Sequence, residues 1–485
     1  MSTTAIIITV VAYLAVMFFV AWLSSRGSSN ASFFTGGRQS NWFLVAFAMI
    51  GSVMSGVTFV SVPGMVAASG FGYLQMCLGF ICGYIVIAYV LTPLYFKLNV
   101  VSIYEYLEKR FGVSSYRTGA WFFFISKILG ASVRLFLVCV SLQLLIFDPL
   151  GLPFALNVAI SAAIVLLYTY SGGVKSVIMI DTLKTACMIL AVVLAIVFIA
   201  KALGYDFAGM CSAVAGSPMS KVFHFSDVNG TQYFWKQFLG GLFTVIAMTG
   251  LDQDMMQRTL SCKNYKDSQK NLIVSSLLQT VVIALFLCLG VLLYQYAFRF
   301  GISATGDDIF PAVATSEGLP AIVGVLFIIG LVGAAYGAGG SALTALTTSF
   351  TVDILGAAGK SEAHLTRVRK TVHVLMAVCM AVVIYVIGLV NTSSTINAVY
   401  TLASYTYGPL LGMFAFGIIT RKRVRDKFVP IVAIAAPLLC LVLQLNSERW
   451  FGGYKFSYEI LLINAALTCL GLCILIRRDK EPAAK

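Results

Sequence analysis

A few ionisable side chains lie within stretches that are otherwise strongly apolar, where a charge is costly unless it is paired or faces water. Asp181 and Lys184 are three residues apart in IMIDTLKTACMIL and would share one face of a helix. Arg134 lies in LGASVRLFLVCV, and a buried guanidinium is well shaped to hold a carboxylate through two hydrogen bonds. Lys127, seven residues earlier, is expected to be structural, with its ammonium reaching toward the membrane surface. A hydroxyl-rich run offers oxygen ligands of the kind that a hard cation such as Na⁺ prefers: Ser341, Thr344, Thr347 and Thr348.

Each of these groups also has a purely structural interpretation. The acid and the lysine could form a local ion pair near the membrane surface. Arg134 could pair with Asp148 or Asp254 from another helix. The hydroxyls could donate back to carbonyls of their own helix.

Other kinds of chemistry find little support in the sequence. The three histidines, His224, His364 and His373, have no metal-ligand spacing. There is no phosphate-binding loop, no catalytic triad and no pair of carboxylates spaced for acid–base catalysis, and no loop is long enough to hold a nucleotide-binding domain. The eleven cysteines are scattered, mostly in apolar stretches, and form no disulfide framework. We therefore expect neither an enzyme nor an ATP-driven pump.

Composition defines the elements that must position these groups. Of the 485 residues, 59% are hydrophobic and 11% are charged, and the mean hydropathy is +0.92, which is typical of an integral membrane protein. The net charge of +14 does not indicate nucleic-acid binding, because the basic residues lie between apolar stretches. The sequence predicts an all-α membrane protein whose first apolar stretch is retained rather than cleaved. It contains thirteen stretches of spanning length, at 3–24, 41–67, 72–97, 117–147, 150–170, 177–202, 234–250, 270–298, 320–354, 366–390, 395–419, 427–445 and 456–477.

The basic residues predict the orientation. With the N-terminus outside, 24 Lys and Arg fall on the cytoplasmic side and 6 on the outer side. This asymmetry favours an outer N-terminus and a cytoplasmic C-terminus. Two long outer loops follow, at 203–233 and 299–319, and residues 102–111 read as an amphipathic helix at the cytoplasmic surface.

The stretch 41–68 is apolar enough to cross a bilayer but poorly built as one helix. Small residues interrupt its middle, and a Pro-Gly pair follows: Gly51, Ser52, Ser55, Gly56, Pro63 and Gly64. Backbone groups freed by a break in a membrane must be satisfied by protein or by a water-filled cavity, so such a break indicates a binding site. The alternative is an unbroken packing helix with small residues at a helix–helix contact.

A second interrupted stretch lies five spans later, at 234–250, where Gly240, Gly241 and Gly250 weaken a short span. Breaks at matching positions predict an inverted repeat of five plus five helices with the site between the breaks. The expected division is a peripheral first helix and cytoplasmic loop at 1–40, repeats at 41–204 and 234–419 separated by an extracellular loop at 205–233, and peripheral spans with a cytoplasmic tail at 420–485.

Several strings in the same order along the chain carry a resemblance. They are FFTGGR at 33–38, SxxTFVSVPG at 55–64, VSIYEYLEKRF at 101–111, YTYSGGVKSVIMID at 168–181, DMMQR at 254–258 and GPLLGMFAFGI at 408–418. Each is weak alone, but as a series the chain resembles the sodium:solute symporter family. The resemblance implies a leucine-transporter-like inverted-repeat fold and alternating access driven by the Na⁺ gradient.

The resemblance also implies residue roles. Substrate contacts would come from Ser55, Thr58, Tyr73, Gln75 and Arg134. The arginine matches a carboxylate-binding position of sialic acid symporters in the family, which favours an organic acid over a neutral sugar. Backbone carbonyls near Gly51, Met54 and Ala334 would bind Na⁺, and a second Na⁺ site would use Asp181 and Ser341.

The chain departs from the family pattern at the main Na⁺ site. The two adjacent hydroxyl positions are Gly337 and Ala338, and Lys184 stands where the family usually has glutamine. Lys184 could therefore supply a fixed or titratable cation, which would make transport Na⁺-independent or H⁺-coupled. Shifted carbonyls and Ser341 could instead still bind Na⁺.

We expect a secondary active transporter of the cell membrane that imports a small polar solute, and we expect that solute to carry a carboxylate such as that of sialic acid. The alternatives are transport of a neutral sugar, an uncoupled facilitator and a transporter-like sensor. The expected partners are the small-molecule substrate, Na⁺ and the lipid bilayer, with no nucleic acid and no fused signalling domain. A monomer is expected, although the sequence does not indicate the oligomeric state.

Overall fold

The structure is a computed structural model that describes residues 3–26, 33–34, 36–170, 173–357, 360–390, 395–456 and 458–477. Within these ranges nine helices are long and apolar enough to cross a membrane, or ten if one bent pair counts as a single span. No strand is present among the described residues, which contain only two isolated β-bridges. The prediction of an all-α membrane protein with many spans is therefore confirmed. Residues 27–32 of the expected first cytoplasmic loop and 478–485 of the expected tail lie outside the described residues.

The long elements follow the predicted apolar stretches closely. They are α1 (Thr3–Ser25), α6 to α7 (Tyr73–Leu98), α9 with η3 (Val113–Phe147), α11 (Gly173–Ala202), α15 (Tyr265–Phe300), α17 with η7 (Ala321–Ile354), α18 (Glu362–Val390), α19 (Thr395–Ile419) and α20 (Val429–Leu445). Three further predicted stretches coincide with shorter helical segments: α10 (Phe154–Thr169), α13 with η5 (Phe234–Gly250) and α22 (Ile460–Ile474).

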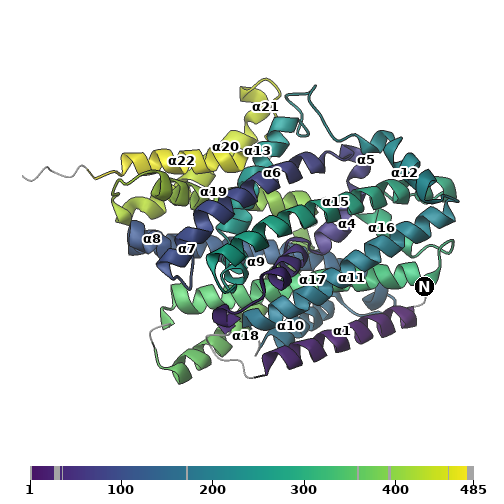
Figure 1. Cartoon of the computed structure of the whole chain (residues 1–485), viewed down its shortest axis with the longest axis horizontal. Coiled ribbons are helices and arrows are strands. Elements are labelled where there is room, and N and C mark those ends of the chain that lie inside the picture. The colour runs from purple at the N-terminus through teal and green to yellow at the C-terminus, as the bar shows by residue number, and fades with distance from the viewer. Residues whose placement is uncertain are drawn as a thin grey trace, which may run out of the picture.

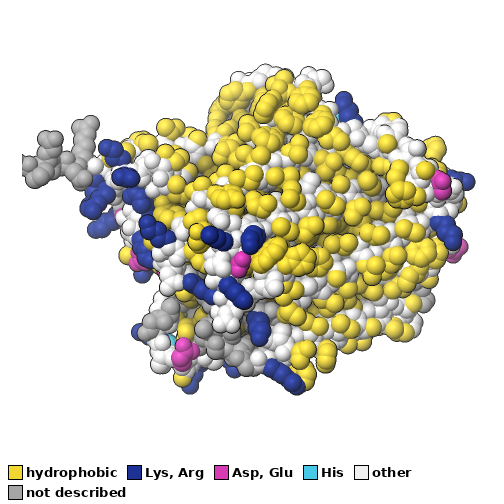
Figure 2. Space-filling model, viewed as in Figure 1, with side chains coloured by type: hydrophobic (Ala, Val, Ile, Leu, Met, Phe, Trp, Pro, Cys, Tyr) yellow, Lys and Arg dark blue, Asp and Glu magenta, His cyan; other side chains and the backbone are white. Residues whose placement is uncertain are grey.

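The helices run side by side along the long axis of the molecule (Figure 1). The start of α1 lies at one end, together with α5 (Val66–Ser69) and α12 (Phe207–Ala215), whereas α8 (Glu105–Arg110) lies at the opposite end. Figure 2 shows a broad hydrophobic surface between the ends, with most of the visible Lys and Arg gathered at the α8 end. A belt of apolar side chains with a basic rim on one side is the surface that a membrane-spanning protein presents to lipid and cytoplasm.

The interruption predicted in 41–68 is present. Helix α3 (Trp42–Val53) ends at Met54, and α4 (Gly56–Gly64) begins after Ser55. Both linking residues have extended backbone conformations, and the two helices are bent by 61°. The break lies beside a close approach to α11, since a Cβ added at Gly51 would lie 2.1 Å from Oγ1 of Thr185.

The second predicted interruption is also a break. The helical segment that contains Gly250 ends there, and Leu251 and Asp252 leave the helical conformation before α14 (Gln253–Thr259) begins. The Asp252 carboxylate caps α14 by accepting a hydrogen bond from the backbone N–H of Met255. Thus two helices are interrupted, and the charged residues described below gather around both breaks.

Candidate functional site

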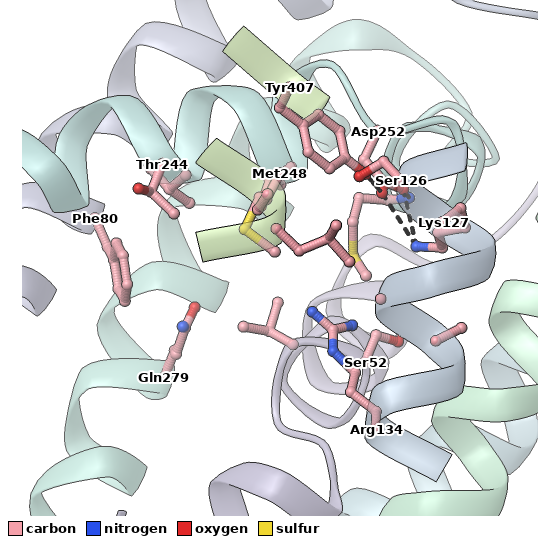
Figure 3. Close-up of a pocket in the computed structure, with 18 residues that line it drawn as sticks. Ser52, Phe80, Ser126, Lys127, Arg134, Thr244, Met248, Asp252, Gln279 and Tyr407 are labelled. Carbon is pink, nitrogen blue, oxygen red and sulfur yellow. Dashed lines mark hydrogen bonds and ion pairs between the residues drawn. The ribbon is translucent and has the colours of Figure 1, made fainter. Parts of the chain in front are cut away.

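A cavity lies between the break after α3 and helices α6, α9, α13, α15 and α19, and the empty space within it, open solvent at its mouth included, is about 750 Å³. The lining mixes apolar and polar side chains: Ser52, Val53, Phe80, Ser126, Lys127, Gly130, Ala131, Arg134, Thr244, Val245, Met248, Thr249, Asp252, Met255, Gln279, Leu402, Ala403 and Tyr407. Figure 3 shows Arg134 and Lys127 on one side, with Phe80, Gln279 and Thr244 across the cavity.

Arg134 is positioned by α9 and directs its guanidinium into the cavity (Figure 3). It makes no hydrogen bond or ion pair with any part of the chain that the structure describes. The two structural partners considered for it are engaged elsewhere. Asp148 accepts a hydrogen bond from Gln143 at 2.6 Å, and Asp254 pairs with Lys127 and Arg258. The interpretation of Arg134 as half of an interhelical ion pair is therefore wrong.

Lys127 is not the surface-reaching lysine that the sequence suggested. Its side chain is buried, and its Nζ lies 3.1 Å from a carboxylate oxygen of Asp252 and 2.8 Å from one of Asp254. Tyr407 of α19 also donates its hydroxyl hydrogen bond to Asp252. The break after Gly250 brings both carboxylates to the lysine, and this could not be read from the spacing along α9.

A second group of buried charges surrounds Asp181 on α11. One carboxylate oxygen accepts hydrogen bonds from Ser52 at 2.8 Å and Ser341 at 3.2 Å, and lies 3.4 Å from the Arg258 guanidinium. The other lies 3.8 Å from Nζ of Lys184, and neither of these two atoms has a hydrogen-bond partner among the described residues. Arg258 in turn holds Asp254 at 2.7 Å, so an unbroken series of ion pairs joins the two groups.

Lys184 does not reach a membrane surface, because its side chain is fully buried. The ammonium instead lies against Gly337 of α17. A Cβ added at Gly337 would lie 2.5 Å from Cδ and 3.2 Å from Nζ of Lys184, and 3.1 Å from the carboxylate of Asp181. The absence of a side chain at this position is what allows the lysine to occupy the space.

The hydroxyl-rich run of α17 was interpreted either as a set of cation ligands or as hydroxyls that donate back to their own helix, and its residues differ in this respect. Ser341 donates to Asp181, whereas Thr348 donates back to the carbonyl of Thr344 at 2.9 Å. Thr347 donates back to Leu343 and also contacts a ring nitrogen of His373 at 2.7 Å. Thr344 lines a small void together with Asp254, Arg258 and Ser341, and its buried hydroxyl has no hydrogen-bond partner among the described residues. The first two residues of the run therefore lie beside the buried charges.

The positions expected to bind Na⁺ through backbone carbonyls lie where α3 ends and in the middle of α17. Gly51 is in the last turn of α3, Met54 is the residue at which that helix ends, and Ala334 lies one turn before Gly337. Helices α3 and α17 pack against each other and against α11. Within the described ranges no group of three His, Cys, Asp or Glu could hold a metal ion.

The expected substrate contacts are not all brought together. Ser55 is buried at the start of α4, and Thr58 is half-buried one turn later. Tyr73 and Gln75 begin α6. The Gln75 amide donates to the carbonyl of Gln232 at 3.1 Å and accepts from the backbone N–H of His224, which ties α6 to the loop at 203–233. Of the five predicted substrate residues, Arg134 alone lines the cavity.

Sequence reasoning missed several polar residues of the cavity. Gln279 on α15, Thr244 on α13 and Tyr407 on α19 each lie in an apolar stretch. The rule that singled out Arg134, a polar group at membrane depth, would also have found Gln279 had it been applied to amides.

Comparison with known proteins gives one family and several relatives. The model of the sodium:solute symporter family matches residues 33–427. The sodium/sialic acid symporter NanT of Aliivibrio fischeri is 26% identical, with 94% of this chain and 91% of that protein aligned. The human sodium-coupled monocarboxylate transporter 2 is 24% identical over 83% of this chain, which spans 65% of that relative's length.

Two solved structures resemble this one. The substrate-bound outward-open state of a Na⁺-coupled sialic acid symporter superimposes with a TM-score of 0.83 at 21% identity, covering 97% of each chain. A nucleobase-cation-symport-1 family transporter gives a TM-score of 0.57 at 12% identity, covering 92% of this chain and 94% of that one. At these identities the likeness shows a shared fold.

Proposed function

Since the chain belongs to the sodium:solute symporter family, we propose that it is a secondary active transporter that imports a small organic acid by alternating access, driven by the Na⁺ gradient. Sialic acid is the first substrate to test, because a similar protein of Aliivibrio fischeri carries that name. The proposed location is the cell membrane, which the long apolar helices support.

The observation that carries the proposed substrate class is the unpaired guanidinium of Arg134. A charge inside a membrane protein is retained only where water, a partner or a ligand compensates it. Lys127, on the same helix, has two carboxylate partners, whereas Arg134 has none among the described residues and faces the cavity. A carboxylate would satisfy it through two parallel N–H···O hydrogen bonds. A neutral sugar would leave the charge uncompensated.

Uptake by the purified protein in proteoliposomes tests this role. Arg134→Ala should lower uptake of radiolabelled sialic acid by about 10- to 100-fold, since a hydrogen bond to a charged group contributes about 1.5–3 kcal/mol. Arg134→Lys keeps the charge but not the two-pronged geometry and should recover only part of the activity. Gly130→Ala is the control for a change in the cavity wall, because no atom lies within 4 Å of the added Cβ. Unchanged uptake by Arg134→Ala would refute the role.

The proposed architecture is thirteen spans with two inverted five-helix repeats at 41–204 and 234–419. The extracellular loop at 205–233 lies between them, and 1–40 and 420–485 are peripheral. The breaks at Met54–Ser55 and Leu251–Asp252 support the repeat, because they lie in the first helix of each proposed half. The basic surface at the α8 end supports a cytoplasmic location for that end and an outer N-terminus at the other.

The proposed Na⁺ contacts are the carbonyls of Gly51, Met54 and Ala334, with Asp181 and Ser341 at a second site. The hydrogen bond from Ser341 to Asp181 supports the second pair, because it already brings two oxygen ligands together. A cation there would share the carboxylate with Arg258, which lies 3.4 Å away.

A second mode of coupling is supported by one specific observation. Lys184 fills the space beside Gly337, where the resemblance predicts a hydroxyl ligand of Na⁺. In this mode the lysine ammonium replaces the ion and transport is Na⁺-independent or H⁺-coupled. Uptake driven separately by a Na⁺ gradient and by a pH gradient distinguishes the modes: full stimulation by Na⁺ alone contradicts the lysine mode, and stimulation by the pH gradient alone contradicts Na⁺ coupling.

A further inference from the structure

Most polar groups that line the cavity are already occupied by other protein groups. Lys127, Asp252 and Tyr407 bind one another. Ser52 donates to Asp181, and Ser126 accepts a hydrogen bond from Thr406 at 2.8 Å. These side chains shape the cavity, but they have little hydrogen-bonding capacity left for a ligand.

The lining groups that remain available include the guanidinium of Arg134, the amide nitrogen of Gln279 and the hydroxyl of Thr244, whereas the Thr249 hydroxyl lies beside that of Tyr84. Gln279 is 97% buried, and its carbonyl oxygen accepts a hydrogen bond from the hydroxyl of Tyr84 at 3.3 Å. Neither its nitrogen nor the Thr244 hydroxyl has a hydrogen-bond partner among the described residues. A buried donor without a partner is unfavourable, so a group that satisfies it gains the corresponding free energy.

The available groups lie on opposite walls. Arg134 projects from α9, whereas Gln279 on α15 and Thr244 on α13 lie across the cavity, near Phe80 (Figure 3). A ligand held by its carboxylate at Arg134 therefore extends toward the amide and the hydroxyl, with apolar side chains such as Phe80 and Met248 along its length.

The charges along the wall limit the ligand to one carboxylate. Lys127 lies within 3.1 Å of two carboxylates, so it has no charge to offer a second acid group. The opposite wall has no cationic residue among those that line the cavity. A second carboxylate would be desolvated there without a counter-charge, which is strongly unfavourable.

We propose that Gln279 is a specificity-determining residue which, together with Thr244, binds a neutral hydroxyl or carbonyl group at the far end of a monocarboxylate held by Arg134. This inference rests on the proposed transport of an organic acid. The substrate class is then a monocarboxylate with a polar, uncharged tail, such as an acidic sugar. An aliphatic acid of similar length leaves the Gln279 amide unpaired, and a site built to bind a polar group rejects a ligand that lacks it. Dicarboxylates are excluded by charge.

The experiment measures binding of three probes to the purified full chain in detergent, by competition against radiolabelled N-acetylneuraminate. The probes are N-acetylneuraminate, hexanoate and adipate. We expect the wild type to bind the first more tightly than the other two. Gln279→Leu should weaken N-acetylneuraminate about tenfold, the equivalent of one lost hydrogen bond, without weakening hexanoate. Gln295→Leu is the control on the same helix, because that amide contacts the carbonyl of Ala213 instead of the cavity.

Because Gln279→Leu also removes one acceptor of the Tyr84 hydroxyl, Thr244→Val, which nearly keeps the shape of threonine, provides a second variant. It should weaken N-acetylneuraminate and spare hexanoate in the same way. Equal binding of N-acetylneuraminate by wild type and by both folded variants would overturn the inference while leaving acid transport standing. A wild type that binds none of the three acids, measured by direct thermal stabilisation, would instead refute the proposed function. Tight binding of adipate would contradict the one-carboxylate argument.

Discussion

The contact between Lys184 and Gly337 makes a quantitative prediction about which side chains can coexist. In Gly337→Ser the new Cβ would lie 2.5 Å from Cδ of Lys184, well inside van der Waals contact. Overpacking of this kind costs about 1–3 kcal/mol, and the lysine must also move away from Asp181. Lys184→Ala removes the obstructing atoms but leaves a void and takes a cation from a buried carboxylate, which costs about 3–5 kcal/mol. Each single change should therefore be destabilising.

The double variant Lys184→Ala/Gly337→Ser should be more stable than the sum of its parts, because the serine enters the space that the lysine vacates. We expect an interaction energy of about 1–3 kcal/mol in the free energy of unfolding, measured by chemical denaturation in detergent as a double-mutant cycle. Lys184→Met removes the charge but keeps a long side chain in the space that the serine would enter. It should therefore not be stabilised by Gly337→Ser in the way that Lys184→Ala is. Gly339→Ser on the same helix is the glycine control, since its nearest neighbour is a side-chain atom of Val165 at 3.2 Å.

Added Na⁺ distinguishes a simple packing effect from a cation site. If the ammonium replaces an ion, the double variant gains a hydroxyl beside Asp181 and loses the competing ammonium, while Arg258 remains 3.4 Å from the carboxylate. Na⁺ should then raise its stability more than that of the wild type, because a ligand that binds only the folded state stabilises it. The reasoning would be refuted if the changes in unfolding free energy of the two single variants summed to that of the double variant within about 0.5 kcal/mol and Na⁺ did not stabilise the double variant.

Two further predictions concern the broken helix and the loop that follows α15. Gly51→Ala should lower thermal stability, because its Cβ would lie 2.1 Å from Oγ1 of Thr185, whereas Gly130→Ala, with no atom within 4 Å, should leave stability unchanged or raise it by up to about 1 kcal/mol. In the loop that follows α15, burial raises the pKa of the Asp307 carboxyl, so the folded state favours its protonated form. This contribution to stability is present below the ordinary pKa of aspartate and is lost as the pH rises through the raised value. Thermal unfolding between about pH 3 and 7 should therefore show a smaller decrease with rising pH in Asp307→Asn than in the wild type; equal slopes for the two proteins would contradict it.

The sequence was most informative where a single residue type is incompatible with its surroundings. Glycine and serine inside the apolar stretch at 41–68 predicted the break that the structure has at Met54 and Ser55. Arginine at membrane depth predicted a group that faces a cavity, and the structure places Arg134 there. Both inferences rest on the free-energy cost of an unpaired backbone group or charge within a membrane, which follows from the residue type and its neighbours in the sequence.

The sequence was least informative about which buried groups meet. Lys127 was expected near the membrane surface, but its partners Asp252 and Asp254 lie 125 and 127 residues away along the chain. Periodicity identifies the face of a helix on which a residue lies, but not which other helix covers that face. Gln75 was expected at the substrate, yet its amide binds the carbonyl of Gln232 in the loop at 203–233, a contact across 157 residues. Pairings over such separations follow from tertiary packing.

The buried charges around the two breaks balance one another, and this balance constrains how a cation can bind. Three cationic and three anionic side chains form one connected series: Lys127, Asp252, Asp254, Arg258, Asp181 and Lys184. With Lys184 charged, the series is neutral without any ion. A Na⁺ placed about 4 Å from the ammonium would be repelled by about 4 kcal/mol at an effective dielectric constant of 20. Na⁺ binding at Asp181 would have to offset this repulsion, which would be relieved if Lys184 moved away or lost its proton. Arg134 forms no ion pair with this series among the described residues, and the anionic substrate that we propose would supply its counter-charge.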